Sequence, residues 1–388
     1  MARKLDVQGG SQKALRSQNE RRVLDALASG GDLTQAQISR ETALAASTVS
    51  NIVNALVKDG VVERKQNLGG PHGQLIGIVP APGTVVGIDL GKRHLRVCLS
   101  NLAHEIIAEA GTDLPSDHGV QDDLNTIDKA LDKVTKEAGI ERSDIRSIGL
   151  AIPAPIDLNQ RRITSSQVMP TWSGIDIPEL FQEHFGIDTF VDNDANLGAI
   201  GERVWGAAHG FDDITYIKVA DGIGAGIILG GQIYRGADGS AGEIGHITID
   251  ERGDMCRCGN RGCLETVASV PSILTLAKPI FPEGSTITDI IDSAKQGNTG
   301  AMRLLEDTGR QLGIALANMV NTLNPRIVVL GGSLSTAGDL IIEPVRRILK
   351  RNAVHGVVRN LEFKGAELGE KSSVLGAVSL ALTHTPQI

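Results

Sequence analysis

The chain has 388 residues, of which 46 are glycine and only 3% are aromatic, and its formal net charge is −8. This length is too great for one small core and predicts about two to three domains. No basic and apolar leader opens the sequence and no run of eighteen apolar residues occurs in it, which argues against a secreted or membrane-spanning protein. We therefore expect a soluble, cytoplasmic protein of the α/β class that makes no contact with a membrane.

The charge is unevenly distributed along the chain. Residues 1–80 carry ten Lys or Arg against seven Asp or Glu, a balance of +3, which leaves −11 on the remainder. A slightly basic N-terminal part on an acidic protein permits contact with a polyanion. The difference is too small to establish nucleic-acid binding by itself.

Three helices are predicted in the first part of the chain. The first begins at Asn19, ends at a Gly-Gly pair and has one apolar face, formed by Val23, Leu24 and Leu27. Thr34 and Gln37 match a capping box that starts a short second helix. A turn at residues 43–45 leads to a third helix that Ser47 caps and that ends near residue 58. Its apolar face consists of Val49, Ile52, Val53 and Leu56.

A β-hairpin is predicted behind these helices. Residues 61–64 and 74–78 are prone to form strands, and a glycine-rich tip at residues 69–73 separates them. A helix-turn-helix followed by a hairpin is a winged helix-turn-helix, an arrangement that reads DNA. Residues 1–80 are therefore predicted to be a DNA-binding domain.

The third helix supplies the surface that would face DNA. Small and short polar residues near its start can approach base edges: Ala46, Ser47, Thr48, Ser50 and Asn51. Candidate phosphate contacts are Arg21, Arg22, Arg40, Lys58, Arg64 and Lys65, and His72 is a polar candidate at the wing tip. The alternative is a helical protein-interaction module with a solvated polar face. The order of the elements and their caps favours DNA binding.

The rest of the chain repeats a strand–turn–strand pattern. Residues 84–91 and 94–99 form the first copy; residues 214–219, a turn at 221–224 and residues 225–229 form the second. Residues 327–332 add a strand with a glycine turn. Helices are predicted at 119–138, 194–205 and 308–323, with an extended segment at 148–152. Two similar α/β halves facing a cleft are therefore expected.

Four side chains in the second half are typical of a zinc site. Cys256, Cys258 and Cys263 lie within eight residues, and His246 lies ten residues before the first of them. One imidazole and three thiolates suit tetrahedral zinc, and four protein ligands leave no position for a reactive water, so the metal is predicted to be structural. The alternatives are incidental cysteines or a disulfide, but two thiols one residue apart are poorly placed to bridge each other.

Four motifs, in this order, resemble those of the ROK family of bacterial sugar repressors and sugar kinases. They are G-I-D-L-G at 87–91, D-N-D-A-N at 192–196, E-x-G-H at 243–246 and C-x-C-G-N-x-G-C-x-E at 256–265. With the winged helix in front, the resemblance covers nearly the whole chain. It implies two actin-like, or ribonuclease-H-like, lobes, which we place at residues 84–205 and 206–388, with the C-terminal helix free to pack back on the first lobe.

The resemblance also implies which residues bind a sugar. Asn193 and Asp194 would hold a sugar hydroxyl, and in the kinases of the family the aspartate is the base for phosphoryl transfer. Glu243 and Glu265 would bind further hydroxyls, and His246 would serve both metal and sugar. Ser165, Ser166 and the turn at Pro153 are expected to line the same cleft. For Asp194 the alternative role is the N-cap of the helix that starts there.

The phosphate-binding turns depart from those of the family's kinases, which read D-x-G-G-T and G-T-G-I-G-G-G. Here Lys92 and Arg93 follow Gly91 in the first turn, and Asp221 replaces the threonine of the second. A carboxylate about 4 Å from a phosphate is repulsive by roughly 1 kcal/mol even in water. Lys92 and Arg93 can bind phosphate or pair with Asp221. We predict that the nucleotide half is degraded and that Asp194 is a vestigial base without catalytic function.

These observations together predict a sugar-responsive transcriptional repressor of carbohydrate uptake and metabolism genes. A sugar or sugar phosphate would alter its affinity for operator DNA. We expect a homodimer or homotetramer, because half-sites about 34 Å apart need two readers. One alternative is an active ATP-dependent sugar kinase with an appended DNA-binding domain. Another is a repressor controlled by a sugar-transport protein.

Overall fold

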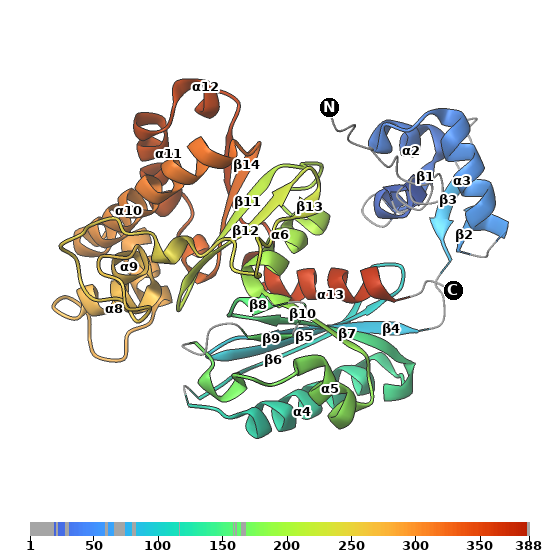
Figure 1. Cartoon of the computed structure of the whole chain (residues 1–388), viewed down its shortest axis with the longest axis horizontal. Helices are drawn as coiled ribbons and strands as arrows, with labels where there is room; N and C mark the ends of the chain where they lie inside the picture. Colours follow the sequence, from blue (N-terminus) through green and yellow to red (C-terminus); the bar gives the residue numbers. More distant parts are fainter. Residues whose placement is uncertain are drawn as a thin grey trace, which may run out of the picture. The chain divides into compact units, whose positions relative to one another are not determined.

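The computed structural model describes residues 19–20, 22–27, 31–58, 61–65, 74–79, 83–115, 117–157, 159, 161–163 and 168–385 (Figure 1). The chain forms two compact units. The smaller takes in residues 1–84, 100–106 and 385–388, and the larger takes in residues 85–99 and 107–384. No helix in the described part of the chain has the length and apolar character needed to cross a membrane.

The smaller unit contains a winged helix-turn-helix. Residues 19–20 and 22–27 are helical, and α2 (Gln35–Thr42) and α3 (Ala46–Lys58) follow. The antiparallel sheet has the order β1-β3-β2, formed by Leu33–Thr34, Leu75–Ile78 and Val62–Lys65. The predicted face of α3 is buried against this sheet and the first helix. The winged helix predicted from the sequence is therefore confirmed.

Of the two predicted helix caps in this unit, one is confirmed and the other is wrong. The capping box is confirmed, since Gln37 N donates to Thr34 Oγ1 at 3.3 Å and Thr34 N donates to Gln37 Oε1 at 2.9 Å. The prediction that Ser47 caps α3 is wrong, because α3 begins at Ala46 and Val49 N already bonds to Ala45 O at 3.0 Å. The left-handed backbone of Ala43, with φ 52°, turns the chain early. Arg21 and the wing tip with His72 lie outside the described residues.

The first lobe of the larger unit is built on a five-stranded sheet of order β10-β7-β4-β5-β6. The strands are β4 (Thr84–Leu90), β5 (His94–Asn101), β6 (Ile106–Asp113), β7 (Ile145–Ile152) and β10 (Thr189–Asn193). Apolar side chains of α4 (Val120–Ala138) and α5 (Ile177–Phe185) pack on one face. On the other face α13 (Ser372–His384) packs on β7, as Figure 1 shows. A Cβ on Gly149 would lie 1.9 Å from Ala377 O, so only glycine permits this approach. A two-stranded hairpin, β8 (Ile156–Asp157) and β9 (Arg162–Ile163), completes the lobe.

The second lobe has a sheet of order β13-β12-β11-β14-β15. Its strands are β11 (Ile214–Val219), β12 (Ile223–Leu229), β13 (Gln232–Ile233), β14 (Ile327–Gly331) and β15 (Glu362–Gly365). The core on one face joins β11 and β14 to α10 (Thr299–Leu323) and α11 (Asp339–Asn352). On the other face lies α6 (Asp194–Trp205). Smaller helices are α7 (Glu265–Ala268), α8 (Val270–Ala277), α9 (Ile287–Lys295) and α12 (His355–Val358).

Several predicted boundaries in this unit are wrong. β7 starts at Ile145 rather than at residue 148, and β5 ends at Asn101 rather than at residue 99. β12 starts at Ile223 rather than at residue 225, because Ile223 already pairs with Val219. α10 starts at Thr299 rather than at residue 308, since Asn298 caps it by accepting a hydrogen bond from Ala301 N at 3.0 Å. The two α/β halves themselves, each with a five-stranded sheet, agree with the prediction.

Candidate functional site

The candidate site forms where several strands end. β10 and β7 run parallel, as do β11 and β14, and in such sheets ligands bind beyond the carboxyl ends of the strands. Asp89 lies near the end of β4, Asn193 ends β10 and Lys218 lies near the end of β11. The fold thus gathers charged side chains from both sheets at one edge.

Asn193 is the N-cap of α6. Its Oδ1 accepts hydrogen bonds from Ala195 N at 2.9 Å and from Asn196 N at 3.3 Å, and its Nδ2 donates to Ala154 O at 3.2 Å. The alternative that Asp194 caps this helix is therefore wrong, because Asp194 is the first residue of α6. The carboxylate of Asp194 remains available for another partner.

That partner is Lys218. Its Nζ lies 2.8 Å from Asp194 Oδ2 and 4.0 Å from Asp89 Oδ2, and it donates to Ser373 Oγ at 3.1 Å. Burial alone would lower the pKa of Lys218, but the charges of Asp194 and Asp89 raise it well above its ordinary range. Lys218 is therefore a permanent cation between two carboxylates. Nothing in its sequence context had marked it as a site residue.

Asp89 is held by a second group as well. His94 Nε2 lies 3.1 Å from Asp89 Oδ2, and its ring packs against Gly91, where a Cβ would meet the imidazole at 2.2 Å. Burial would raise the pKa of Asp89, but the charge of Lys218 and the hydrogen bond from His94 outweigh it and lower the pKa to about 2. Asp89 is thus an ionised, buried carboxylate in the first turn.

The second turn carries Asp221. Arg93 Nε lies 3.4 Å from Asp221 Oδ2, so of the two alternatives for Arg93, pairing with Asp221 is the one found. The amide of Ile223 in the same turn donates to Glu265 Oε2 at 3.2 Å. The ion pair between Arg93 and Asp221 therefore joins the first turn to the second, and Glu265 accepts a hydrogen bond from the second turn.

His246, Cys256, Cys258 and Cys263 come together as predicted. Their ligand atoms all lie within 4.8 Å of one another. Cys258 Sγ is 3.7 Å from Cys263 Sγ, and Cys256 Sγ is 3.5 Å from His246 Nδ1. A zinc tetrahedron has edges of about 3.8 Å between sulfurs and about 3.6 Å between sulfur and nitrogen. The four cysteines of the chain are free thiols, and Cys98 is buried in β5 apart from this cluster. The disulfide alternative is therefore wrong, and the cluster can hold a metal ion.

The backbone of the knuckle explains how these ligands converge. Gly262 has φ 68°, and a Cβ there would lie 1.5 Å from Asp250 O. Only glycine allows this left-handed backbone and this close approach. Cys256 N donates to Asn260 O at 2.7 Å, which closes the turn that brings Cys256 and Cys263 together.

Glu243 stands beside the metal cluster. Its Oε2 lies 3.6 Å from His246 Nε2, the ring nitrogen that faces away from Cys256. Partial burial of the carboxyl group and the negative charges of Glu265 and Asp194 raise the pKa of Glu243 to about 7, although the side chain as a whole is 40% exposed. The segment before it is anchored on β12, because Ala225 N donates to Gly242 O at 2.8 Å.

Glu265 is fixed by a residue of the knuckle that the sequence did not single out. Arg257 Nε lies 2.7 Å from Glu265 Oε1, and Arg257 Nη2 lies 2.8 Å from Oε2. This bidentate pair orients the carboxylate. Its position between Cys256 and Cys258 could have identified Arg257 as a site residue from the sequence. Ser165 and Ser166 lie outside the described residues.

The candidate DNA-contacting residues differ in their environment. Ala46, Ser47 and Asn51 are exposed at the start of α3, and Thr48 and Ser50 are half-buried. Arg40 is exposed on α2. Arg64 bonds to Gln74 Oε1 at 3.2 Å and to Asn54, while Lys65 pairs with Asp32 at 3.0 Å. Arg64 and Lys65 must therefore give up an existing partner to bind phosphate.

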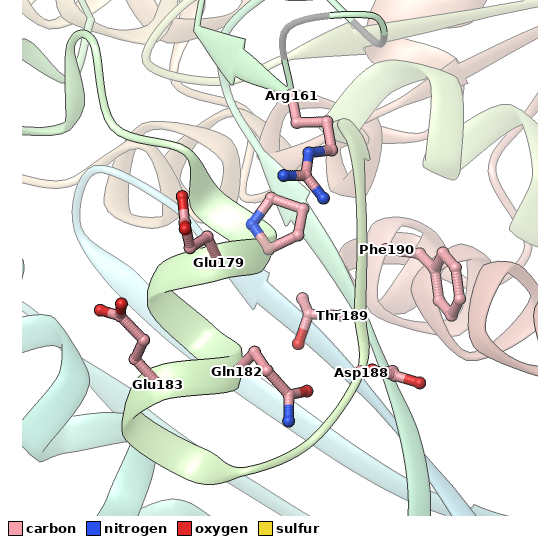
Figure 2. Close-up of a pocket in the computed structure, with 8 residues that line it drawn as sticks. Arg161, Glu179, Gln182, Glu183, Asp188, Thr189 and Phe190 are labelled. Atoms are coloured by element: carbon pink, nitrogen blue, oxygen red, sulfur yellow. The ribbon is translucent and has the colours of Figure 1, made fainter.

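A cavity of about 540 Å³ lies elsewhere on the first lobe. Its lining includes Glu179, Gln182 and Glu183 of α5 and Thr189 and Phe190 at the start of β10, as Figure 2 shows. Asn193 is at the other end of that strand, about 10 Å further along. This cavity therefore contains none of the predicted site residues.

The fold and site together define an actin-like protein of two lobes with a winged helix-turn-helix. The model of the ROK family matches residues 85–384, and that of the MarR family matches residues 17–69. The chain belongs to the ROK family.

Known relatives include repressors and kinases. The chain is 31% identical over 371 residues to the xylose repressor of Bacillus spizizenii, covering 94% of this chain and 95% of that one. It is 33% identical over 309 residues to the glucokinase of Halalkalibacterium halodurans, covering 75% and 92%. A solved ROK transcriptional regulator, a homologue of the Escherichia coli Mlc protein, has the same fold, with a TM-score of 0.76 and 23% identity over 95% of this chain and 96% of that one.

Proposed function

We propose that this chain is a sugar-responsive DNA-binding repressor. One observation carries the proposal: a winged helix-turn-helix is joined to a ROK domain in which the carboxylate of Asp194 is already neutralised by Lys218 at 2.8 Å. A base for phosphoryl transfer must hydrogen-bond to the hydroxyl of its substrate, whereas the Asp194 carboxylate forms an ion pair with Lys218. The similarity to a xylose repressor, which matches both parts of the chain, supports the same conclusion.

In this proposal the effector's hydroxyls are bound by Asp194, Asn193, Glu243, His246 and Glu265. Clustered carboxylates and an amide suit polyol hydroxyls. A structural zinc ion held by His246, Cys256, Cys258 and Cys263 would fix the knuckle. His246 Nδ1 would bind the metal, and Nε2 would be left to donate to Glu243 or to the sugar.

The winged helix would bind operator DNA with Ala46, Ser47, Thr48, Ser50 and Asn51 toward base edges. Arg40, Arg64 and Lys65 would contact phosphates. A dimer or tetramer is proposed because paired half-sites need two readers. A repressor acts where its DNA is, which supports a cytoplasmic location. We also propose that the DNA-binding domain ends near residue 80 and the first lobe near residue 205.

The effector would act through the relative arrangement of the lobes. A ligand shifts such an equilibrium only by its different affinity for the two arrangements. The test is a titration of operator affinity against a panel of sugars, beginning with xylose, at fixed salt. The proposal requires that at least one sugar changes the affinity; if none binds and none changes it, the proposal is wrong.

The second candidate function is that of a sugar kinase, and the similarity to a glucokinase favours it. The paired turns argue against it, because Asp221 and Glu265 occupy positions around the second turn where phosphate would be repelled. An assay with ATP, magnesium and a hexose panel distinguishes the two. Turnover that disappears in Asp194→Asn would establish the kinase. Control by a sugar-transport protein is tested separately by a pull-down with such proteins.

A further inference from the structure

The cations around the candidate site are already paired with carboxylates of this chain. Lys218 bonds to Asp194, Arg257 holds Glu265 in a bidentate pair and Arg93 pairs with Asp221. The Lys218 pair is the most enclosed of these, since the side chains of Lys218, Asp194 and Asp89 are 13%, 12% and 1% exposed. In the described part of the chain, Lys92 alone among the cations of the two turns has no such pair.

The balance of charge at the site is slightly negative. Five carboxyl groups, on Asp89, Asp194, Asp221, Glu243 and Glu265, stand against three paired cations and Lys92, and Glu243 is only partly ionised at neutral pH because its pKa is raised to about 7. A phosphate group entering here would compete with two carboxylates for Lys218 and would be repelled by the others.

An uncharged hydroxyl meets no such obstacle. The bond from Lys218 engages Oδ2 of Asp194, and Oδ1 accepts no hydrogen bond from the described residues. That oxygen can accept one from a sugar hydroxyl. Ser373 Oγ, which accepts from Lys218, in turn donates to Asp194 O at 2.9 Å, so the ammonium group, α13 and the start of α6 hold each other in place. The acceptor is therefore preorganised without any charge on the ligand.

We propose that Lys218 determines the class of effector: as an internal counter-ion of Asp194 and Asp89, it makes the site a receptor for uncharged sugars that rejects their phosphate esters. This inference rests on the proposed function, since it concerns the same site. It excludes the sugar phosphate that the sequence alone left open.

Calorimetry on the full-length, zinc-loaded protein tests the inference directly. Each sugar of the panel is titrated beside its own phosphate ester, and operator affinity is measured with both. We expect the ester to bind at least tenfold more weakly than the free sugar, the size of a repulsion between unit charges across a partly buried site. An ester that binds as tightly as the free sugar, or more tightly, overturns the inference and leaves the proposed function intact. If neither form binds, both fail.

Two substitutions test whether the charge around Lys218 is the cause. Asp89→Asn keeps the shape of the side chain and makes the site more positive by one unit, so the ratio of the dissociation constant of the ester to that of the free sugar should fall at least threefold. Lys364→Met is the matched control, because Lys364 pairs with Glu362 on β15 at 2.9 Å, and it should leave the ratio unchanged. A ratio in Asp89→Asn equal to that of the unmodified protein contradicts the role of Lys218. A third variant, Lys92→Met, tests the unpaired cation of the first turn. If the affinity for the ester depends on Lys92, the role proposed for Lys218 is contradicted.

Discussion

His246 presents its two ring nitrogens to two different partners: Nδ1 lies 3.5 Å from Cys256 Sγ, and Nε2 lies 3.6 Å from Glu243 Oε2. When one nitrogen of a histidine binds a metal, the other usually donates to a carboxylate, which fixes the ring. A metal bound at the knuckle would therefore orient Glu243 through a single side chain. Through this connection a metal without an open coordination position would affect ligand binding.

Loss of one thiol should remove the metal and the sugar response together. In Cys258→Ser we expect zinc content to fall from about one ion per chain to near zero. Sugar binding should weaken at least tenfold, because Glu243 and Glu265 lose their support. Elemental analysis and calorimetry measure the two effects. Cys98→Ala is the control, because Cys98 lies apart from the cluster, and it should keep the metal. Full sugar response in a zinc-free Cys258→Ser protein would refute this connection.

Arg257 should act on the sugar without acting on the metal. Arg257→Ala removes the bidentate partner of Glu265, which is 9% exposed as a side chain. Sugar affinity should fall about tenfold, since charged hydrogen bonds of this kind contribute roughly 1.5–3 kcal/mol. Zinc content should stay near one per chain. Arg261→Ala is the matched control, because Arg261 lies in the same knuckle but donates to Gly253 O at 3.1 Å rather than to Glu265. This variant should bind sugar normally. Equal losses in both variants would mean that the effect is not specific to Glu265.

Acid should remove the contribution of Asp89 to stability. Its pKa is lowered from 3.8 to about 2 in the folded protein, so its stabilisation is complete above about pH 4 and is lost as the pH falls towards 2. The full shift corresponds to about 2 kcal/mol. Urea unfolding at pH 7 should show Asp89→Asn to be less stable by about this amount, and the difference should shrink between pH 4 and pH 2. Metal loss in acid affects both proteins and cancels in the comparison. A difference that does not depend on pH would contradict the ionised state of Asp89.

Arg40 and Lys65 should contribute unequally to DNA binding. Arg40 is exposed, whereas Lys65 pairs with Asp32 at 3.0 Å and must leave it to reach a phosphate. Arg40→Ala should weaken binding to all sequences and reduce the salt slope by about 1, while Lys65→Ala should have a smaller effect. Salt titrations of affinity for specific and random duplexes provide the comparison. A larger loss in Lys65→Ala would show that its pair with Asp32 is absent on DNA.

Local patterns predicted the fold well where the signal lay within a few residues. The capping box of Thr34 and Gln37 and the apolar face of α3 are examples, because both depend on short spacings along one helix. The start of α3 was predicted two residues late, since the left-handed turn at Ala43 leaves no sequence signature when the residue is alanine. β1 was missed because two residues are too few to show a period.

The residues of the candidate site were likewise predicted only where the sequence signal was local. His246 and the three cysteines could be predicted to converge, because their types and spacing are specific to metal binding. Lys218 could not, because it lies in an ordinary strand and its importance comes from Asp194 and Asp89, which are far from it in sequence. The sequence likewise suggested Asp194 as the N-cap of α6, whereas Asn193 is the N-cap in the structure, because either type of residue can cap a helix.

The most direct test of a sugar-responsive repressor is fluorescence anisotropy of an operator duplex, selected from random DNA, with the full-length protein at fixed salt. At least one sugar of the panel should change the dissociation constant for the operator tenfold or more. The same sugar should have no effect on Glu265→Gln, in which a neutral amide replaces the carboxylate that pairs with Arg257. An operator affinity that no sugar changes would contradict the proposed function.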